Sequence, residues 1–318
     1  MKKIINNSFL EFNFILFPIW ILPSYYLLST LFSTEITFLI FLILLGETHF
    51  ASTFLFYFDK KNRDYVKKKK IILVYFPILI CIFYFLFGLN YFNYAVLIGA
   101  IASGIHVTRQ SIGISRLFAY KRNIYFEILI YFSSFLFLFI GFVRFYLKDF
   151  SSLFFFFNVN EIFYQNLNNL VEDNIIKIFL VLFLSFLSLT EKVDYKKKLV
   201  NLCGVLIYAP YCFVYNIYDA IIIGVGAHWS QYILINYKIY FYNQKTNLKN
   251  TIQILLILLY ALIMGMLGYT KHFDKQFIEI LILIPLTGQF FHYYVDAFIW
   301  KFSVKEIREQ IGTRLFAK

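Results

Sequence analysis

Hydrophobic residues in this chain occur in long uninterrupted runs, separated by short segments rich in lysine, arginine and other polar residues. Runs of about twenty apolar residues are typical of membrane-spanning helices, whereas membrane β-strands alternate over about ten residues. The pattern therefore predicts an all-α fold, a polytopic transmembrane helix bundle of about ten spans. The expected spans are residues 9–31, 35–58, 71–89, 91–115, 124–147, 174–190, 199–218, 219–237, 251–269 and 277–301.

Composition supports a membrane protein and argues against a nucleic-acid partner. Of the 318 residues, 60% are hydrophobic and 15% are charged, which is more apolar surface than a soluble domain of this length can bury. The net charge of +12 comes from short basic clusters between the apolar runs, the arrangement that the positive-inside rule describes. We therefore expect an integral protein of the bacterial inner membrane, with membrane lipids and an apolar small molecule as its partners.

The charges of the connecting segments orient the chain. Basic segments alternate along the chain with charge-poor or acidic ones, and the basic ones are 59–70, 116–122, 196–198, 238–249 and 301–308. This alternation predicts that both termini are cytoplasmic. We expect a transmembrane domain over residues 1–302 and an amphipathic tail, 303–318, on the inner leaflet. Residues 149–173 are expected along the outer interface, and Trp20 and Trp300 in the interfacial aromatic belt.

Four histidines fall inside the expected spans, and the fifth, His272, falls in a loop. All four spans run from outside to inside, and each histidine precedes the charged end of its span by nine or ten residues. At about 1.5 Å per residue, each imidazole lies roughly 13–15 Å from the cytoplasmic end of its helix. Four imidazoles at one depth can converge on a metal ion. These candidate metal ligands are His49, His106, His228 and His292.

Other polar residues share helix faces with these histidines. Gln110 lies four residues after His106, and Gln231 lies three residues after His228. Gln289 lies three residues before His292, and Asp296 lies four residues after it. At this spacing a side chain can orient an imidazole through its second nitrogen. Glu47 is two residues before His49 and therefore lies on a different side of the helix. We expect it to orient a ligand on a neighbouring helix or to be a metal ligand itself. Glu47 and Asp296 are the expected catalytic acids.

Imidazole-rich sites suit iron, copper or zinc. The chain lacks the HxxxH and HxxHH clusters of diiron membrane desaturases and the HExxH motif of zincins. Two helices can also hold a haem between two histidines. Four ligands at one depth instead favour a mononuclear, non-haem iron site, with haem or another transition metal as the alternative.

In size, helical character and its four intramembrane histidines, the chain resembles the Brp/Blh family of bacterial membrane β-carotene-cleaving dioxygenases. His49, His106, His228 and His292 carry the resemblance. That family has a histidine–glycine motif near its start and a close histidine pair later, whereas here Phe50 follows the first histidine and no two histidines are four apart. The resemblance implies an iron-dependent oxygenase that takes a carotenoid, another isoprenoid or a lipid from the bilayer.

Two other functions stay open. A haem-binding electron-transfer protein would use the histidines as axial ligands. A transporter would combine them with Glu47, Arg109 and Asp296 into a polar pathway, because charged groups inside spans often mark transport routes. We find no internal repeat of the kind that many transporters contain, which disfavours this second alternative.

Overall fold

The computed structural model describes residues 8–118, 123–147, 161–190, 193–241, 248–269 and 275–315. These residues are almost entirely helical and contain no β-strand, which confirms the all-α fold. His272 and residues 149–160 of the expected interfacial segment lie outside the described residues. Residues 161–173 form the first part of a long helix.

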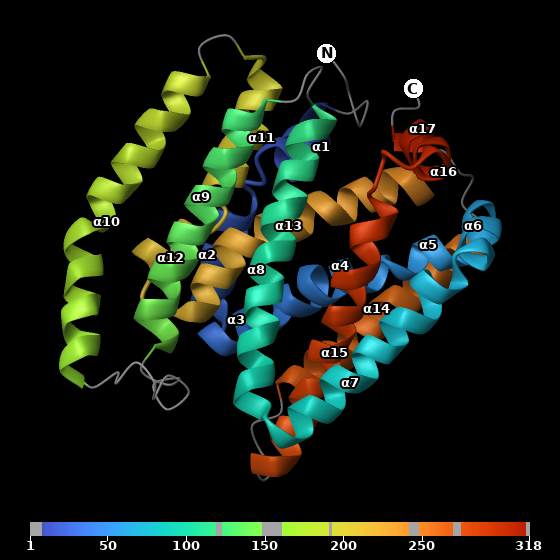
Figure 1. Cartoon of the computed structure of the whole chain (residues 1–318), viewed down its shortest axis with the longest axis horizontal. Helices are drawn as coiled ribbons and strands as arrows, with labels where there is room; N and C mark the ends of the chain where they lie inside the picture. Colours follow the sequence, from blue (N-terminus) through green and yellow to red (C-terminus); the bar gives the residue numbers. More distant parts are fainter. Residues whose placement is uncertain are drawn as a thin grey trace.

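The helices are labelled in Figure 1, where η marks a 3-10 or π-helical segment. The first part of the chain contains α1 (Ser8–Glu11), η1 (Phe12–Leu16), α2 (Ile21–Leu31), α3 (Thr34–Phe41), η2 (Leu42–Glu47), α4 (Thr48–Ser52), α5 (Phe54–Phe58), η3 (Lys60–Asn62), α6 (Arg63–Lys68), η4 (Ile71–Tyr75) and α7 (Phe76–Asn90). The middle part contains α8 (Phe92–Leu117), α9 (Ile124–Gly141), η5 (Phe142–Tyr146), α10 (Glu161–Leu189), α11 (Tyr195–Leu206), α12 (Pro210–Phe213) and α13 (Ile217–Tyr240). The last part contains α14 (Leu248–Gly268), α15 (Lys275–Ile299), α16 (Lys305–Ile307), η7 (Arg308–Gly312) and α17 (Thr313–Leu315).

Fewer helices are apolar enough to cross a membrane than the sequence predicted. Every expected span overlaps a helix or a set of consecutive helices. Within the described residues, however, only 5 helical stretches are long and apolar enough to cross a membrane, or 6 if one bent pair counts as a span. The bent pair is Ser8–Leu16 with Ile21–Leu31, at 73°. The 5 stretches are Thr34–Ser52, Ile71–Asn90, Ile124–Phe145, Leu248–Gly268 and Phe277–Ile299.

Polarity, not length, separates the longest remaining helices from these stretches. The helices α8, α10 and α13 have 26, 29 and 24 residues, about 39, 44 and 36 Å at the α-helical rise. All three carry charged residues, such as Arg109 on α8, Glu172 on α10 and Lys238 on α13. The predicted figure of ten spans is therefore not supported by hydropathy alone.

Side-chain caps and prolines set several helix boundaries. Ser33, Asn123, Asp194 and Asn216 accept hydrogen bonds from backbone N–H groups at the starts of α3, α9, α11 and α13. The cap at Asn216 locates the boundary between the two expected spans that meet near Asp219. Two other breaks involve proline, which cannot donate a backbone hydrogen bond: Pro18 lies between η1 and α2, and Pro210 begins α12.

The break before α12 lies directly against α13. A Cβ atom at Gly224 would come within 2.3 Å of the carbonyl oxygen of Ile207. Only glycine allows this close approach of two backbones. Consequently α13 packs tightly against the connection between α11 and α12.

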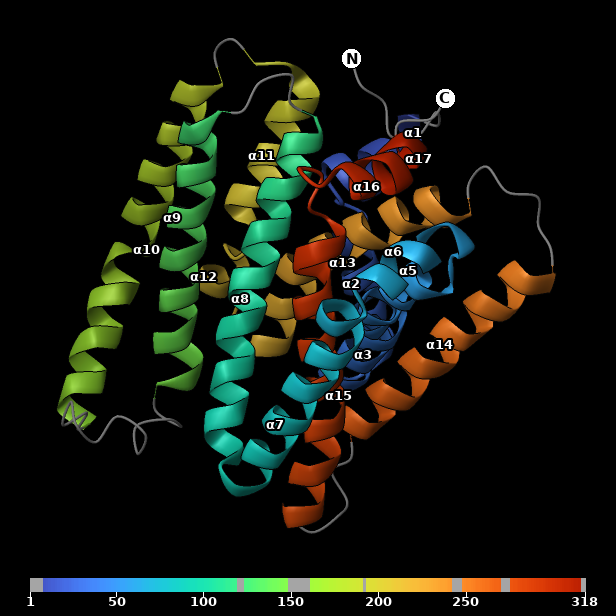
Figure 2. The same ribbon diagram turned by 45° about the vertical axis from the view of Figure 1, so that its right-hand side comes forward.

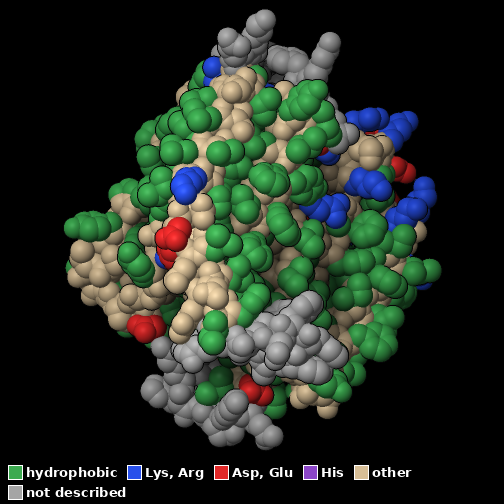
Figure 3. Space-filling model, turned by 60° about the vertical axis from the view of Figure 1, so that its left-hand side comes forward, with side chains coloured by type: hydrophobic (Ala, Val, Ile, Leu, Met, Phe, Trp, Pro, Cys, Tyr) green, Lys and Arg blue, Asp and Glu red, His purple; other side chains and the backbone are tan. Residues whose placement is uncertain are grey.

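The outer surface of the bundle is largely apolar. Phe83 on α7, Phe135 on α9 and Leu255 on α14 are 65%, 70% and 58% exposed. In Figure 3 hydrophobic side chains cover most of the visible face, and basic side chains gather toward its right-hand edge. Extensive exposed apolar surface marks a membrane or protein contact, so this exterior is compatible with an integral membrane protein.

The C-terminal segment packs onto the helices. Ile307, Ile311 and Leu315 are buried in one core cluster with Phe56 of α5, and Arg314 forms an ion pair with Asp59. The apolar side of the expected tail therefore faces protein, whereas the sequence suggested the inner leaflet. Figures 1 and 2 show α1 and α17 at the same end of the molecule.

Candidate metal centre

Four helices bring the four predicted histidines together. His49 lies on α4, His106 on α8, His228 on α13 and His292 on α15, and all four are buried. The ring centroid of His49 lies 4.4 Å from that of His292, 4.9 Å from that of His228 and 6.1 Å from that of His106. The convergence expected from their matched depths is present in the structure.

Three of these histidines form a compact group of nitrogen atoms. One nitrogen each of His49, His106 and His292 lies within 4.8 Å of the others. The Nε2 atoms of His106 and His292 are 3.0 Å apart. The fourth, His228, lies outside this group, although its ring adjoins His49 and lies 5.8 Å from the ring of His106. The arrangement is thus a triad with a fourth imidazole beside it.

Several imidazole nitrogens in this centre have no hydrogen-bond partner. Both ring nitrogens of His49 and both of His228 are buried and unpartnered in the described structure. Leaving a buried polar atom unsatisfied costs about 1–3 kcal/mol, and such atoms are rare in native proteins. Neutral imidazole nitrogens are common ligands of transition metals. The donor set therefore fits a metal ion.

A threonine that sequence reasoning missed orients His292. The Oγ1 atom of Thr53, between α4 and α5, lies 2.5 Å from Nδ1 of His292. This contact occupies Nδ1, so Nε2 remains on the side of His106. The hydroxyl of Tyr232 lies 3.5 Å from Thr53 Oγ1, and the Tyr232 ring is 4.2 Å from that of His49.

Asp296 continues this chain of hydrogen bonds. The Tyr232 hydroxyl and the indole Nε1 of Trp300 donate to Oδ1 of Asp296, the latter over 3.0 Å, and Gln110 donates to Oδ2. All three partners are donors, as an ionised carboxylate requires. An acceptor at this end directs every proton the same way: the His292 imidazole donates to Thr53, Thr53 to Tyr232, and Tyr232 to Asp296.

This network differs in detail from the sequence prediction. Gln110 and Asp296 were expected to contact imidazoles, but they bond to each other, and Asp296 reaches His292 only through two hydroxyl groups. Trp300, expected in the interfacial belt, donates inward. Spacing along one helix did reveal that these residues face the same region, but the intervening hydroxyls come from other helices.

Glu47 and Gln289 form a second polar contact near the triad. The Glu47 carboxylate is buried, its side chain hydrogen-bonds with Gln289, and its Oε2 atom has no partner among the described residues. The Tyr293 hydroxyl donates to Gln289 over 3.4 Å, and the Tyr293 ring is 4.6 Å from that of His106. Glu47 does not belong to the compact nitrogen group.

Gln231 has a different role from the predicted one. Its amide nitrogen donates to the carbonyl of Ile15 over 2.7 Å and to Cys203 Sγ over 3.5 Å, and not to an imidazole. The break at Pro18 explains the first bond: the next available N–H, on Ile19, bonds to Phe17 instead. Gln231 therefore supplies a donor to a broken helix end.

A π-helical turn precedes the first histidine. The segment η2 runs from Leu42 to Glu47, and the Thr48 hydroxyl donates to the carbonyl of Ile43 over 2.8 Å. Such turns change the helical rotation of the residues that follow and often occur at functional sites. No residue pattern along this segment predicts the turn, so the direction in which His49 points was not predictable from spacing.

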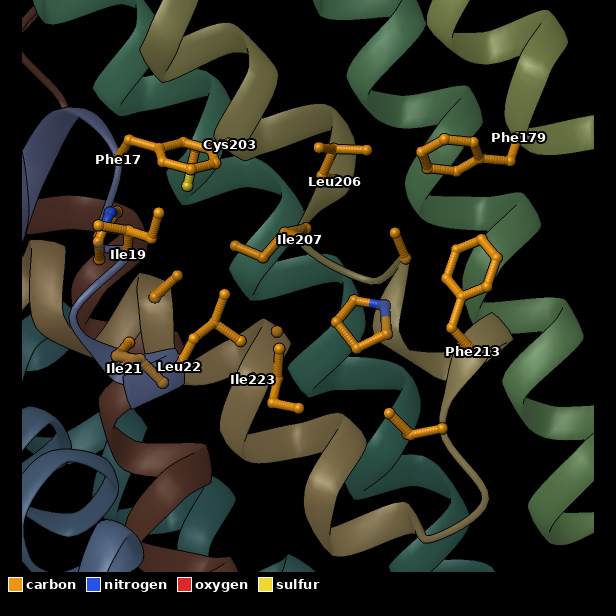
Figure 4. Close-up of a pocket in the computed structure, with 16 residues that line it drawn as sticks. Phe17, Ile19, Ile21, Leu22, Phe179, Cys203, Leu206, Ile207, Phe213 and Ile223 are labelled. Atoms are coloured by element: carbon orange, nitrogen blue, oxygen red, sulfur yellow. The ribbon is translucent and has the colours of Figure 1, made fainter. Parts of the chain in front are cut away.

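An apolar pocket adjoins α13. Its volume is about 370 Å³, and it lies between the η1–α2 break, α10, the α11–α12 connection and α13 (Figure 4). Phe17, Leu22, Phe179 and Phe213 are among its lining residues, and Cys203 contributes a thiol. Ala227 also lines it, directly before His228 in the chain. This chemistry suits a hydrocarbon chain.

No protein-family model matches this chain, and neither the curated proteins nor the solved structures contain a significant match. The functional argument therefore depends on the geometry of the metal centre and its surroundings. Buried neutral imidazoles, with a carboxylate at the end of a hydrogen-bond chain, can hold a divalent transition metal.

Proposed function

We propose that this protein is an integral membrane metalloenzyme in which His49, His106, His228 and His292 bind one non-haem iron ion. The supporting observation is the buried triad of imidazole nitrogens, beside which both nitrogens of His228 have no partner in the described structure. The ring of His228 adjoins that of His49, with centroids 4.9 Å apart, so a fourth imidazole lies beside the triad.

Non-haem iron suits this centre better than haem. In a bis-histidine haem, the two ligand nitrogens lie on opposite faces of a porphyrin. The Nε2 atoms of His106 and His292, 3.0 Å apart, leave no room for a macrocycle between them. A metal held by imidazoles keeps coordination positions open, and bound iron would there supply the binding and activation of dioxygen.

The reaction we propose is that of an oxygenase or oxidoreductase on a lipid or isoprenoid, as the resemblance to the Brp/Blh family implies. The apolar exterior gives such a molecule access through the bilayer, and the pocket beside α13 offers apolar space for its chain. Its volume lies within the range of small-molecule sites, roughly 300–1,000 Å³. Ala227 lines the pocket and directly precedes His228 in the sequence. The hydrocarbon chain of the substrate would therefore lie along α13, which carries the fourth imidazole.

In this proposal Glu47 and Asp296, predicted as catalytic, support the histidine ligands of the metal. Asp296 is a positioning residue: through Tyr232 and Thr53 it holds His292 with Nε2 free for iron. Glu47, with one carboxylate oxygen unpartnered among the described residues, is the acid closest in sequence to His49.

We also propose the topology of ten crossings with both termini in the cytoplasm of a bacterial cell. The supporting facts are a helix or a set of consecutive helices at each of the ten predicted positions, α1 and α17 at one end of the molecule, and basic residues in every second connection. Under this proposal α8 and α13 cross the membrane with His106 and His228 toward the protein interior.

The deciding experiment is the metal content of the detergent-purified protein, kept free of chelators. We expect about one iron per chain, as a mononuclear site requires. A variant with His106→Ala and His292→Ala should lose the iron, whereas His272→Ala should retain it. A folded protein without bound transition metal would overturn the proposal, as would equal iron in all three proteins. A Soret absorption band would establish haem instead.

A further inference from the structure

A second recess, which none of the histidines lines, combines basic and apolar side chains. It lies between the end of α5, the start of α6 and the first turns of α14, with a volume of about 600 Å³. We call it the α6–α14 groove. Its lining residues are Tyr57, Phe58, Arg63, Leu248, Lys249, Ile252, Gln253 and Leu256.

The two cations of the groove come from separate elements. Arg63 begins α6 and Lys249 lies in the first turn of α14, and both are exposed. Neither makes an ion pair within the described structure, and no acidic residue lines the groove. The N–H groups at the start of α14 add positive potential at the same place. This end of the groove is therefore suited to an anion.

The other end of the groove is apolar. Leu248, Ile252 and Leu256 recur every four residues and so follow one face of α14 away from the cations. Phe58, Ile252 and Leu256 are 42%, 47% and 49% exposed. A positively charged end that continues into an apolar face is complementary to an anionic phospholipid, which has a negatively charged head followed by hydrocarbon chains.

We propose that the α6–α14 groove binds one anionic phospholipid. Its phosphate lies between Arg63 and Lys249, and one acyl chain follows Ile252 and Leu256. Lipids of negative charge attract lysine and arginine on the cytoplasmic side of membranes, where the positive-inside rule places this groove. An inorganic phosphate would satisfy the two cations but would leave the apolar face uncovered, which is why we favour the lipid.

Such a lipid would join α14 to the segment that carries the first histidine. Tyr57 and Phe58 follow His49 on the same helical stretch, and α14 contacts both η2 and α4. A ligand that binds only the folded state raises its stability. We therefore expect the anionic lipid to raise the melting temperature of the protein, whether or not iron is bound.

The test compares the lipids phosphatidylglycerol and phosphatidylcholine on the full-length protein in detergent, by native mass spectrometry and thermal unfolding. The groove variant is Arg63→Gln with Lys249→Gln. The control, Lys67→Gln with Lys301→Gln, removes the same charge from two exposed lysines outside the groove. We expect phosphatidylglycerol affinity to fall on the order of tenfold in the groove variant and to stay within about twofold in the control.

Three results would overturn the proposal: equal losses in both variants, equal binding of the two lipids by the wild-type protein, or displacement of the lipid by millimolar inorganic phosphate. The first would indicate general attraction to a basic surface, and the last a simple anion site. The groove shares no residue with the histidine centre, so the outcome is independent of the iron measurement.

Discussion

The hydrogen bond between Thr53 and His292 allows a direct test of how the centre holds its metal. Thr53→Val removes the hydroxyl but nearly preserves the shape of the side chain. Because Oγ1 lies 2.5 Å from Nδ1, the change deprives Nδ1–H of its acceptor and cuts the connection to Tyr232 and Asp296. The imidazole then loses the partner that fixes its tautomer and ring orientation.

The expected magnitude follows from this loss. Removing the partner of a metal-ligating histidine typically lowers metal affinity 10–100-fold, which corresponds to about 1.4–2.7 kcal/mol. A buried Nδ1–H without an acceptor carries a comparable penalty of about 1–3 kcal/mol. Thr53→Ser retains the hydroxyl, so we expect it to bind iron with nearly the wild-type affinity.

The assay is competition for iron(II) against a chelator of known affinity, with folding checked by circular dichroism. Thr37→Val is the matched control, because the Thr37 hydroxyl is buried on the same helical stretch but has no hydrogen-bond partner within the described structure. The reasoning would be refuted if Thr53→Val bound iron as tightly as the wild-type protein. It would equally be refuted if Thr37→Val lost as much affinity as Thr53→Val.

Two further predictions concern bonds that stabilise the fold. Gln231→Leu should lower the free energy of unfolding by about 1–3 kcal/mol, because the carbonyl of Ile15 loses its buried donor. The iron affinity should stay unchanged. Weaker iron binding with unchanged stability would contradict this prediction. Lys196→Met should destabilise the protein by about 3–5 kcal/mol in chemical denaturation, because it removes the ammonium group from the buried Glu11 carboxylate. The double variant Lys196→Met with Glu11→Leu should recover much of this loss. No recovery would argue against the ion pair as the cause.

The convergence of the histidines was predictable because it depends on two simple regularities. Loop charges give the direction of each span, and the constant rise of an α-helix converts residue number into depth. His49, His106, His228 and His292 each lie nine or ten residues from a charged helix end. Neither regularity depends on knowing how the helices rotate or which ones are neighbours.

The hydrogen-bond partners were not predictable for the opposite reason. Thr53 and Tyr232 contact His292 from other elements, so their roles depend on helix rotation and packing. The π-helical turn η2 alters the rotation ahead of His49, and the break at Pro18 gives Gln231 a backbone partner that no intact helix would offer. Spacing along one helix contains no information about such deviations.

The span prediction shows the same division between depth and surroundings. Apolar composition does not follow burial: 17% of the apolar window of α14 is buried against 56% of that of Ile124–Phe145, and both pass, whereas α13, which buries His228, Trp229 and Tyr232, does not. A helix enclosed by others is free to carry charges and hydrogen-bonding groups, because its neighbours shield them from lipid. The polar groups that lower the apolarity of α8 and α13 include the buried His106 and His228, and these two helices supply two of the four imidazoles. The 29-residue helix α10 fails the same test but packs against α9 and η5, so low apolarity alone does not locate the metal centre; the buried imidazoles do.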